Sequence, residues 1–178
     1  HGAEALLRWE HPVAGRISSP LMVKLAEEES FLDELGLYII KEACKDAQKL
    51  QKEGTPLSIS VNISPKQLES AVFVREVRRI LQEVDLHDIQ LILEVTERSL
   101  LSTSGRILER IRELKQLGIQ MSMDDFGMGH SSMMYLQENA FDEVKLDGSL
   151  VRQILENERS RDIVRGITRL AASMQFHV

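Results

Sequence analysis

The sequence predicts an α/β fold in which parallel strands alternate with helices. Two observations carry this prediction. Apolar runs of strand length recur along the chain, and the amphipathic segments between them are long enough to cross back over a parallel sheet. An α/β barrel and an open doubly wound sheet both satisfy this order. Because no glycine-rich phosphate fingerprint follows the first strand, the open dinucleotide-binding sheet is disfavoured.

The elements expected from apolar periodicity alternate strictly along the chain. A turn at His11, Pro12 and Gly15 follows the first strand, and Ser19-Pro20 starts the first helix, through Leu25. The other expected helices cover about 35–53, 65–84, 102–117, 131–136 and 158–174. The expected strands cover 2–10, 57–64, 89–96, 119–123 and 143–146, and a further strand begins at 176–178.

An eight-stranded barrel usually needs ~250 residues. This chain has 178 residues and shows five strands plus the start of a sixth. We therefore expect a single partial domain over 1–178, a TIM-like (β/α)8 barrel that lacks its first strand and its last strand-helix units.

The composition limits the classes of function. The net charge of −6 argues against a DNA- or RNA-binding surface, because such surfaces are rich in Lys and Arg. Cys44 is the only cysteine, which excludes an internal disulfide and suits a reducing compartment. We interpret it as a packed helix residue. No apolar run has the length of a membrane span and no secretion signal opens the chain, so we expect a cytoplasmic domain whose parent protein could be membrane-anchored.

Polar side chains interrupt successive strands near their carboxyl ends, where barrels of this kind place active sites. Carboxylates and an amide oxygen are hard ligands that suit Mg²⁺, Mn²⁺ or Ca²⁺. Two adjacent aspartates can hold a pair of ions ~3.5 to 4 Å apart, as in phosphoester hydrolysis. The polar residues in question are Glu4, Arg8, Asn62, Glu94, Asp124, Asp125 and Lys145.

Two simpler interpretations remain open at this point. The stretch from Asp124 to Ser132 could be an ordinary polar turn, since Asp and Gly are common turn formers. Lys145 could be a buried ion-pair partner of the carboxylates rather than a fixed positive charge beside water or phosphate.

The same residues carry a family resemblance that spans the chain. Glu4-Ala5-Leu6, followed by Leu7-Arg8-Trp9, resembles the motif that names the EAL domains, the cyclic-di-GMP phosphodiesterases of bacterial GGDEF/EAL signalling proteins. Further matching motifs follow in the family's order: His11-Pro12, Leu25-Ala26-Glu27-Glu28, Ser60-Val61-Asn62-Ile63-Ser64, Glu94-Val95-Thr96-Glu97, Asp124-Asp125-Phe126-Gly127 and Lys145-Leu146-Asp147.

The resemblance implies metal-dependent hydrolysis of cyclic di-GMP to linear pGpG with two Mg²⁺ or Mn²⁺ ions, and inhibition by Ca²⁺. It also implies a homodimer, formed partly through the loop 127–132, and attached GGDEF or sensor domains. The implied roles are metal binding by Glu4, Asn62, Glu94, Asp124 and Asp125, substrate binding by Leu6 and Arg8, and catalytic work by Lys145, Asp125 and Glu97. Lys145 would orient or activate water, and Glu97 would brace the loop.

Three positions depart from the family pattern, namely Met128, His130 and Met133 in or beside that loop. The family also continues past Val178 with a further metal-binding glutamate, so the fragment by itself could be inactive. The first alternative is therefore a degenerate EAL domain that binds cyclic di-GMP or a protein without hydrolysis. A TIM-barrel aldolase with Lys145 as a Schiff-base nucleophile is the alternative from another chemistry.

Overall fold

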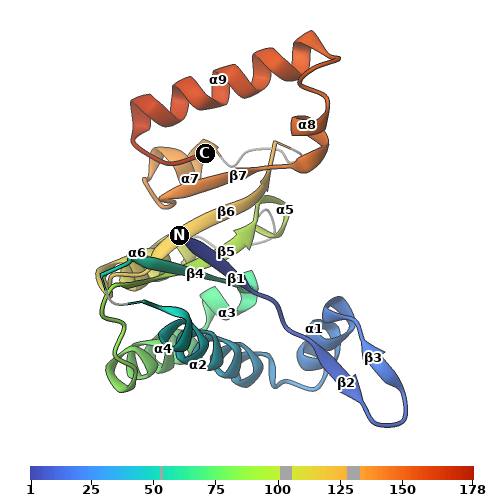
Figure 1. Ribbon diagram of the computed structural model, residues 1–178, viewed down its shortest axis with the longest axis vertical. Coiled ribbons are helices and arrows are strands. Elements are labelled where there is room, and N and C mark those ends of the chain that lie inside the picture. The colour runs from blue at the N-terminus through green and yellow to red at the C-terminus, as the bar shows by residue number, and fades with distance from the viewer. Residues whose placement is uncertain (53, 101–105, 128–132) are drawn as a thin grey trace. The chain divides into compact units, whose positions relative to one another are not determined.

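The structure is a computed structural model of the 178-residue chain and describes residues 1–52, 54–100, 106–127 and 133–178 (Figure 1). The chain divides into two compact units, His1–Leu91 and Ile92–Val178, and each is described by itself. That residues 1–178 form a single domain stays a prediction. No helix in the described ranges is both long and apolar enough to cross a membrane.

The first unit contains a parallel strand pair and a separate hairpin. Strand β1 (Gly2–Ala5) pairs in parallel with β4 (Leu57–Asn62), and β2 (Trp9–His11) pairs antiparallel with β3 (Gly15–Ile17). The prediction of one strand over 2–10 is therefore wrong in length. Gly15 has a φ of +69°, which permits the tight turn at the expected place. The turn brings β3 back beside β2, so Trp9–His11 pair with β3 and do not continue β1.

Four helices are described in this unit: α1 (Ser19–Glu28), α2 (Leu32–Leu50), α3 (Pro65–Glu69) and α4 (Ala71–Glu83). The helix predicted over 65–84 is broken at Ser70, whose backbone is extended. The Ser70 hydroxyl oxygen accepts the Phe73 N–H at 3.1 Å and donates to Asp33 Oδ2 at 2.6 Å, so it caps α4 and ties it to α2. An amphipathic pattern alone does not reveal such an internal cap.

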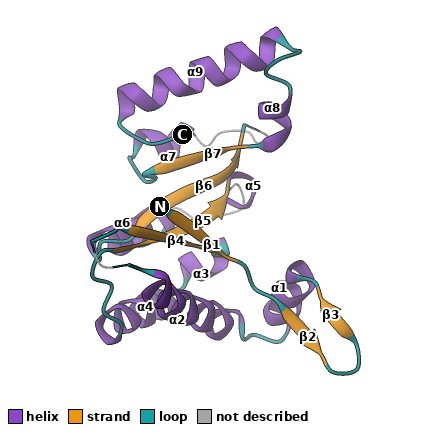
Figure 2. Cartoon of the chain, viewed as in Figure 1, coloured by secondary structure: helices purple, strands orange, loops and turns teal. Residues whose placement is uncertain are grey.

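Helix α2 supplies much of the apolar core of this unit, and Figure 2 shows it running beside α4. Its buried residues recur at helical spacing as Gly36, Ile40, Ala43, Cys44 and Ala47. Cys44 is fully buried, and desolvation raises the pKa of its thiol to about 11. This confirms that Cys44 is a packed helix residue, and a neutral buried thiol of this kind is unreactive.

Gly36→Ala is expected to lower the free energy of unfolding by about 3 kcal/mol. An added Cβ would lie 1.9 Å from Gln67 Nε2 and 3.1 Å from Phe73 Cε2. Gln67 cannot move away cheaply, because its Nε2 donates to the Leu32 carbonyl at 2.9 Å and its Oε1 accepts the Ser64 N–H at 2.8 Å. Urea unfolding followed by circular dichroism measures the change.

Gly166→Ala is the matched control, since it makes the same substitution at a helical glycine with nothing within 4 Å of the added Cβ. We expect this variant to be as stable as the wild type or more stable by up to ~1 kcal/mol. A wild-type unfolding curve for Gly36→Ala would contradict the packing described around Gln67.

The second unit is built on three parallel strands in the order β5, β6, β7 (Figure 2). Strand β5 (Ile89–Thr96) starts in the last residues of the first unit, and β6 (Gln120–Phe126) and β7 (Glu143–Leu146) follow. The helices described here are α5 (Glu97–Leu100), α6 (Ile107–Gln116), α7 (Met133–Gln137), α8 (Gly148–Arg152) and α9 (Glu158–Met174).

Several predicted elements of this unit are confirmed at their full bounds, namely β5, β7 and α9. The strand expected to begin at 176 is also confirmed, because His177 bridges Glu143 in parallel and its carbonyl accepts the Val144 N–H at 2.9 Å. The short helices α5 and α8 were not predicted. The predicted helix starts at 102 and 131 lie outside the described residues.

Candidate active site

The predicted aspartate pair lies in an irregular part of β6, opposite Lys145. Strands β6 and β7 pair through Met123↔Val144 and again through Phe126↔Leu146, and the register shifts between these pairs. Asp124 and Asp125 therefore stand opposite the single residue Lys145 in a β-bulge. The prediction of a strand over 119–123 is wrong in its end, because β6 continues through both aspartates to Phe126.

Successive residues of a regular strand point to opposite faces of a sheet, so regular alternation would send Asp124 and Asp125 to opposite faces. The bulge interrupts this alternation at the two aspartates. Asp125 has a φ of +56°, a left-handed conformation that Asp tolerates better than most residues. Desolvation raises the pKa of Asp125, the Asp124 and Asp147 carboxylates raise it further, and the Arg98 guanidinium opposes them. Neighbouring carboxylates that repel one another favour a site that a cation can occupy.

Glu94 and Lys145 form an ion pair inside this unit. The Lys145 ammonium donates to Glu94 Oε1, and Glu94 is 1% exposed. Glu94 Oε2 is buried and has no hydrogen-bond partner among the described residues. An ionised carboxylate with one unsatisfied buried oxygen is costly, so this atom is a fitting ligand for a hard cation. Lys145 is thus an ion-pair partner of Glu94, as the simpler interpretation held. The second carboxylate oxygen of Glu94, Oε2, is left available as a metal ligand.

Glu97 lies at the start of α5, directly after β5, and is 3% exposed. Its Oε2 accepts the backbone N–H of Gly127 at 3.0 Å, and Gly127 has a φ of +102°, which a residue with a side chain rarely adopts. Glu97 therefore holds the first residue after β6. The loop positions Met128 and His130 lie outside the described residues, and Met133 begins α7 with 49% exposure.

The predicted site residues of the first unit are also at the carboxyl end of their strands. Asn62 Nδ2 donates to Glu4 Oε1 at 2.8 Å, and this leaves the amide oxygen of Asn62 available as a ligand. Leu6 is 54% exposed. Arg8 Nη1 donates to the Leu7 carbonyl at 3.0 Å, and its remaining guanidinium N–H groups can reach an anion.

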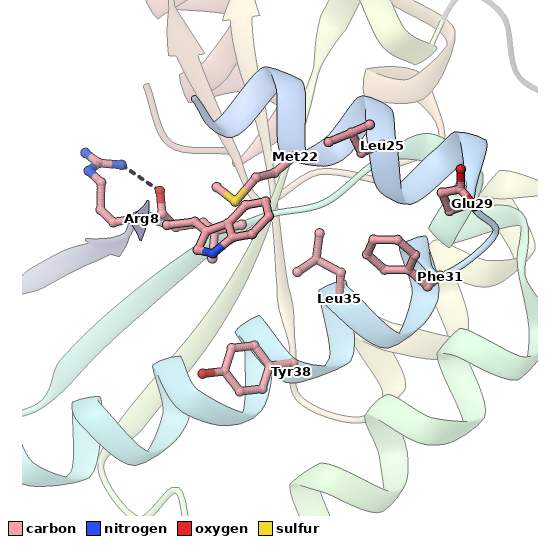
Figure 3. Close-up of a pocket in the computed structure, with 9 residues that line it drawn as sticks. Arg8, Met22, Leu25, Glu29, Phe31, Leu35 and Tyr38 are labelled. Atoms are coloured by element: carbon pink, nitrogen blue, oxygen red, sulfur yellow. Dashed lines mark hydrogen bonds between the residues drawn. The ribbon is translucent and has the colours of Figure 1, made fainter. Parts of the chain in front are cut away.

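An apolar groove of ≈ 520 Å³ in the first unit was not predicted from the sequence. Figure 3 shows it between α1 and α2, with Arg8 at its edge and its guanidinium directed away from Met22 and Leu25. A phosphodiester needs donors and cations, and apart from Arg8, whose guanidinium points away, the lining is mostly apolar. The groove therefore adds no residue to the candidate site.

Asp147 is a second feature that the sequence analysis did not single out as functional. Its side chain caps α8, accepting the Ser149 N–H at 2.7 Å, and the hydrogen bonds from Ser149 lower the pKa of the Asp147 carboxyl. The Asp-Gly-Ser sequence at 147–149 is a recognisable helix start that could have signalled this cap. Its charge acts on Asp125, as the raised pKa of Asp125 records.

The described residues contain no group of three or more His, Cys, Asp or Glu side chains arranged to hold an ion by themselves. In the second unit Glu94 binds Lys145, and Asp124 Oδ1 accepts the Asp125 N–H at 2.9 Å. The chemistry of the donors still suits a hard divalent cation, because only carboxylate and amide oxygens are offered and the one cysteine of the chain, Cys44, is buried in α2.

In each unit the parallel strands carry polar side chains toward their carboxyl ends, the arrangement typical of α/β folds whose sites lie at those ends. The EAL domain model matches residues 1–178, so the chain belongs to the EAL domain family. The predicted family is thereby confirmed. The fold class is confirmed by the solved structure described below.

Three relatives illustrate the match. An "uncharacterized signaling protein" of Caulobacter vibrioides is 39% identical over 99% of this chain and 22% of its own length. The cyclic di-GMP phosphodiesterase NbdA of Pseudomonas aeruginosa is 34% identical over 100% of this chain and 23% of its own length. MucR of the same species, a bifunctional diguanylate cyclase/cyclic di-GMP phosphodiesterase, is 33% identical over 99% of this chain and 26% of its own length.

A solved structure of the PaMucR phosphodiesterase in complex with c-di-GMP aligns with a TM-score of 0.81 and 32% identity. The alignment covers 98% of this chain and 71% of that chain. This chain thus has the TIM-like α/β architecture of EAL domains, and it spans about a quarter of the length of the curated relatives described above.

Proposed function

We propose that the protein containing this chain hydrolyses cyclic di-GMP to linear pGpG in a reaction that needs divalent metal. The observation that carries the proposal is the β6 bulge, which sets Asp124 and Asp125 opposite Lys145. Membership of the EAL family and the names of the relatives NbdA and MucR support the substrate. The bulge supports a charged site rather than the ordinary polar turn that the sequence also allowed.

The proposed cofactors are two ions of Mg²⁺ or Mn²⁺, with Ca²⁺ as an inhibitor. Such ions, when bound, lower the pKa of a water and neutralise charge on a phosphodiester. The donor chemistry supports this choice, and the unsatisfied Oε2 of Glu94 supports it independently. The proposed ligands are Glu4, Asn62, Glu94, Asp124 and Asp125, and Asp124 and Asp125 share in the second ion.

The chain's own cationic groups would then act on water and substrate. Lys145, held by Glu94, orients the attacking water and adds positive charge where the phosphodiester gains negative charge. Arg8 binds a substrate phosphate, and Leu6 packs against the substrate. Because Lys145 is paired as an ammonium with a carboxylate, it is poorly suited to the neutral-amine nucleophile of a Schiff-base aldolase.

Glu97 positions the loop that follows β6 through its bond to the Gly127 N–H. We propose that this loop also contributes to a homodimer, and that the parent protein carries a GGDEF or sensor domain as the bifunctional MucR carries a second activity. The domain itself is proposed to work in the cytoplasm.

Incubation of the intact protein with cyclic di-GMP and Mg²⁺ or Mn²⁺, followed by chromatography, tests the proposal. We expect pGpG to form with metal and not with EDTA, and to be absent when only Ca²⁺ is supplied. Tight binding of cyclic di-GMP without any pGpG would contradict the phosphodiesterase and establish the receptor, which is the alternative function of a degenerate EAL domain.

A further inference from the structure

Buried Ser122 and half-buried Glu143 form a polar pair one layer beneath the proposed active site. Ser122 is fully buried in β6, and its hydroxyl donates to Glu143 Oε1 at 2.8 Å. The two residues are register partners on adjacent strands, immediately before the bulge begins. Burying a hydroxyl costs free energy unless it forms a hydrogen bond, so the partner of a buried serine in a strand is informative.

Glu143 lies on the same face of β7 as Lys145, because residues two apart along a strand share a face. Their Cα atoms are therefore separated by about 6.6 Å, within reach of two long side chains of opposite charge. Besides the aspartates of the bulge, Lys145 thus has Glu94 on β5 and Glu143 on its own strand within reach of its side chain. In the structure its ammonium donates to Glu94.

The position of Ser122 explains how these carboxylates are kept apart. Ser122 is the register partner of Glu94 on one side and of Glu143 on the other, so it separates the two acids within the sheet. It gives Glu143 a neutral donor, whereas Glu94 receives the charged donor. A carboxylate that loses its hydroxyl donor keeps its charge and has an unsatisfied oxygen, so a Glu143 without its serine would compete for the ammonium.

We propose that Ser122 is a positioning residue, which holds the Glu143 carboxylate and so directs Lys145 to Glu94 and the Asp124 bulge. This inference rests on the proposed function, since it assigns a role in placing Lys145 for hydrolysis. Neither residue belongs to the motifs that carry the family resemblance.

The test compares Ser122→Ala, Glu143→Gln and the double variant in the intact protein. Ser122→Ala frees a charged Glu143 and is expected to lower kcat roughly fivefold to tenfold at unchanged KM. Glu143→Gln removes the competing charge and is expected to keep wild-type kcat. The double variant is also expected to recover wild-type kcat, because residue 143 then carries no charge that could draw Lys145 away from Glu94.

Ser160→Ala is the matched control, since Ser160 is another buried serine of the second unit, with its hydroxyl bonded to Gln153 Oε1 at 3.3 Å. It is expected to leave kcat unchanged. A purely structural role for Ser122 predicts that the double variant is as slow as Ser122→Ala, and that result would overturn the proposal. So would wild-type kcat in Ser122→Ala.

A crystal structure of Ser122→Ala separates failure of this inference from failure of the proposed function. If the wild-type protein does not hydrolyse cyclic di-GMP, the phosphodiesterase proposal fails, yet the lysine can still be observed. Nζ of Lys145 displaced from Glu94 toward Glu143 would support the positioning role. Nζ remaining on Glu94 would overturn it.

Discussion

Asp124→Asn is expected to reduce the rate of cyclic di-GMP hydrolysis by roughly 10³-fold. Asp124 opens the bulge opposite Lys145, and it is the proposed ligand shared by both ions. An amide keeps the size of the side chain but removes the negative charge that a divalent cation requires. Initial rates of pGpG formation, measured across a range of Mn²⁺ concentrations, give the loss in kcat and in the apparent metal affinity.

Asp142→Asn is the matched control for Asp124→Asn. Asp142 precedes β7, so it lies at the amino end of the strand, away from the carboxyl ends where the proposed ligands lie. Its Oδ2 accepts the Met121 N–H at 2.9 Å, and an amide oxygen can accept the same bond. We expect the control to turn over as the wild type does. Equal turnover in Asp124→Asn and the wild type would remove the basis for a metal site at the bulge.

Lys145→Met is expected to lower kcat by roughly 10²-fold while metal binding is retained. The substitution keeps an unbranched chain but deletes the ammonium that donates to Glu94. It also frees Glu94 Oε1 for a cation, so the apparent affinity for Mn²⁺ should be equal to that of the wild type or higher. Isothermal titration with Mn²⁺, alongside product analysis, separates the two effects.

Lys115→Met provides the comparison for Lys145→Met, because Lys115 also pairs with a carboxylate of the second unit, Asp142, at 2.9 Å. Its loss should leave both kcat and Mn²⁺ affinity unchanged. The two proposed site residues therefore have distinct signatures: Asp124→Asn loses metal binding and turnover together, and Lys145→Met loses turnover alone. Loss of Mn²⁺ binding in Lys145→Met would show that the lysine acts through the metal site instead.

The elements predicted best are those whose pattern is simple and whose ends are marked. Strand β5 is mostly apolar from Ile89 to Val95, and helix α9 follows Asn157, whose side chain accepts the Arg159 N–H at 2.9 Å as a cap. Strand β7 and the start of the last strand at His177 were predicted on the same grounds. In these segments local pattern and tertiary structure agree.

The features that the sequence did not reveal depend on which partner each segment finds in the folded chain. The break at Ser70 needs Asp33 on another helix, and the hairpin of Trp9–His11 competes with continuation of β1. Alternation along β6 predicts opposite faces for Asp124 and Asp125, and only the pairing with β7 shows the bulge. The candidate residues could thus be named from sequence, but their arrangement could not.

The central claim is that the bulge at Asp124 and Asp125 is a metal site beside Lys145. Anomalous diffraction from crystals of the intact protein, grown with Mn²⁺ and cyclic di-GMP, tests it most directly. We expect two Mn²⁺ peaks ~3.5 to 4 Å apart, with an Asp124 oxygen bound to both and an Asp125 oxygen to one. Bound cyclic di-GMP with no Mn²⁺ at these aspartates would contradict the claim.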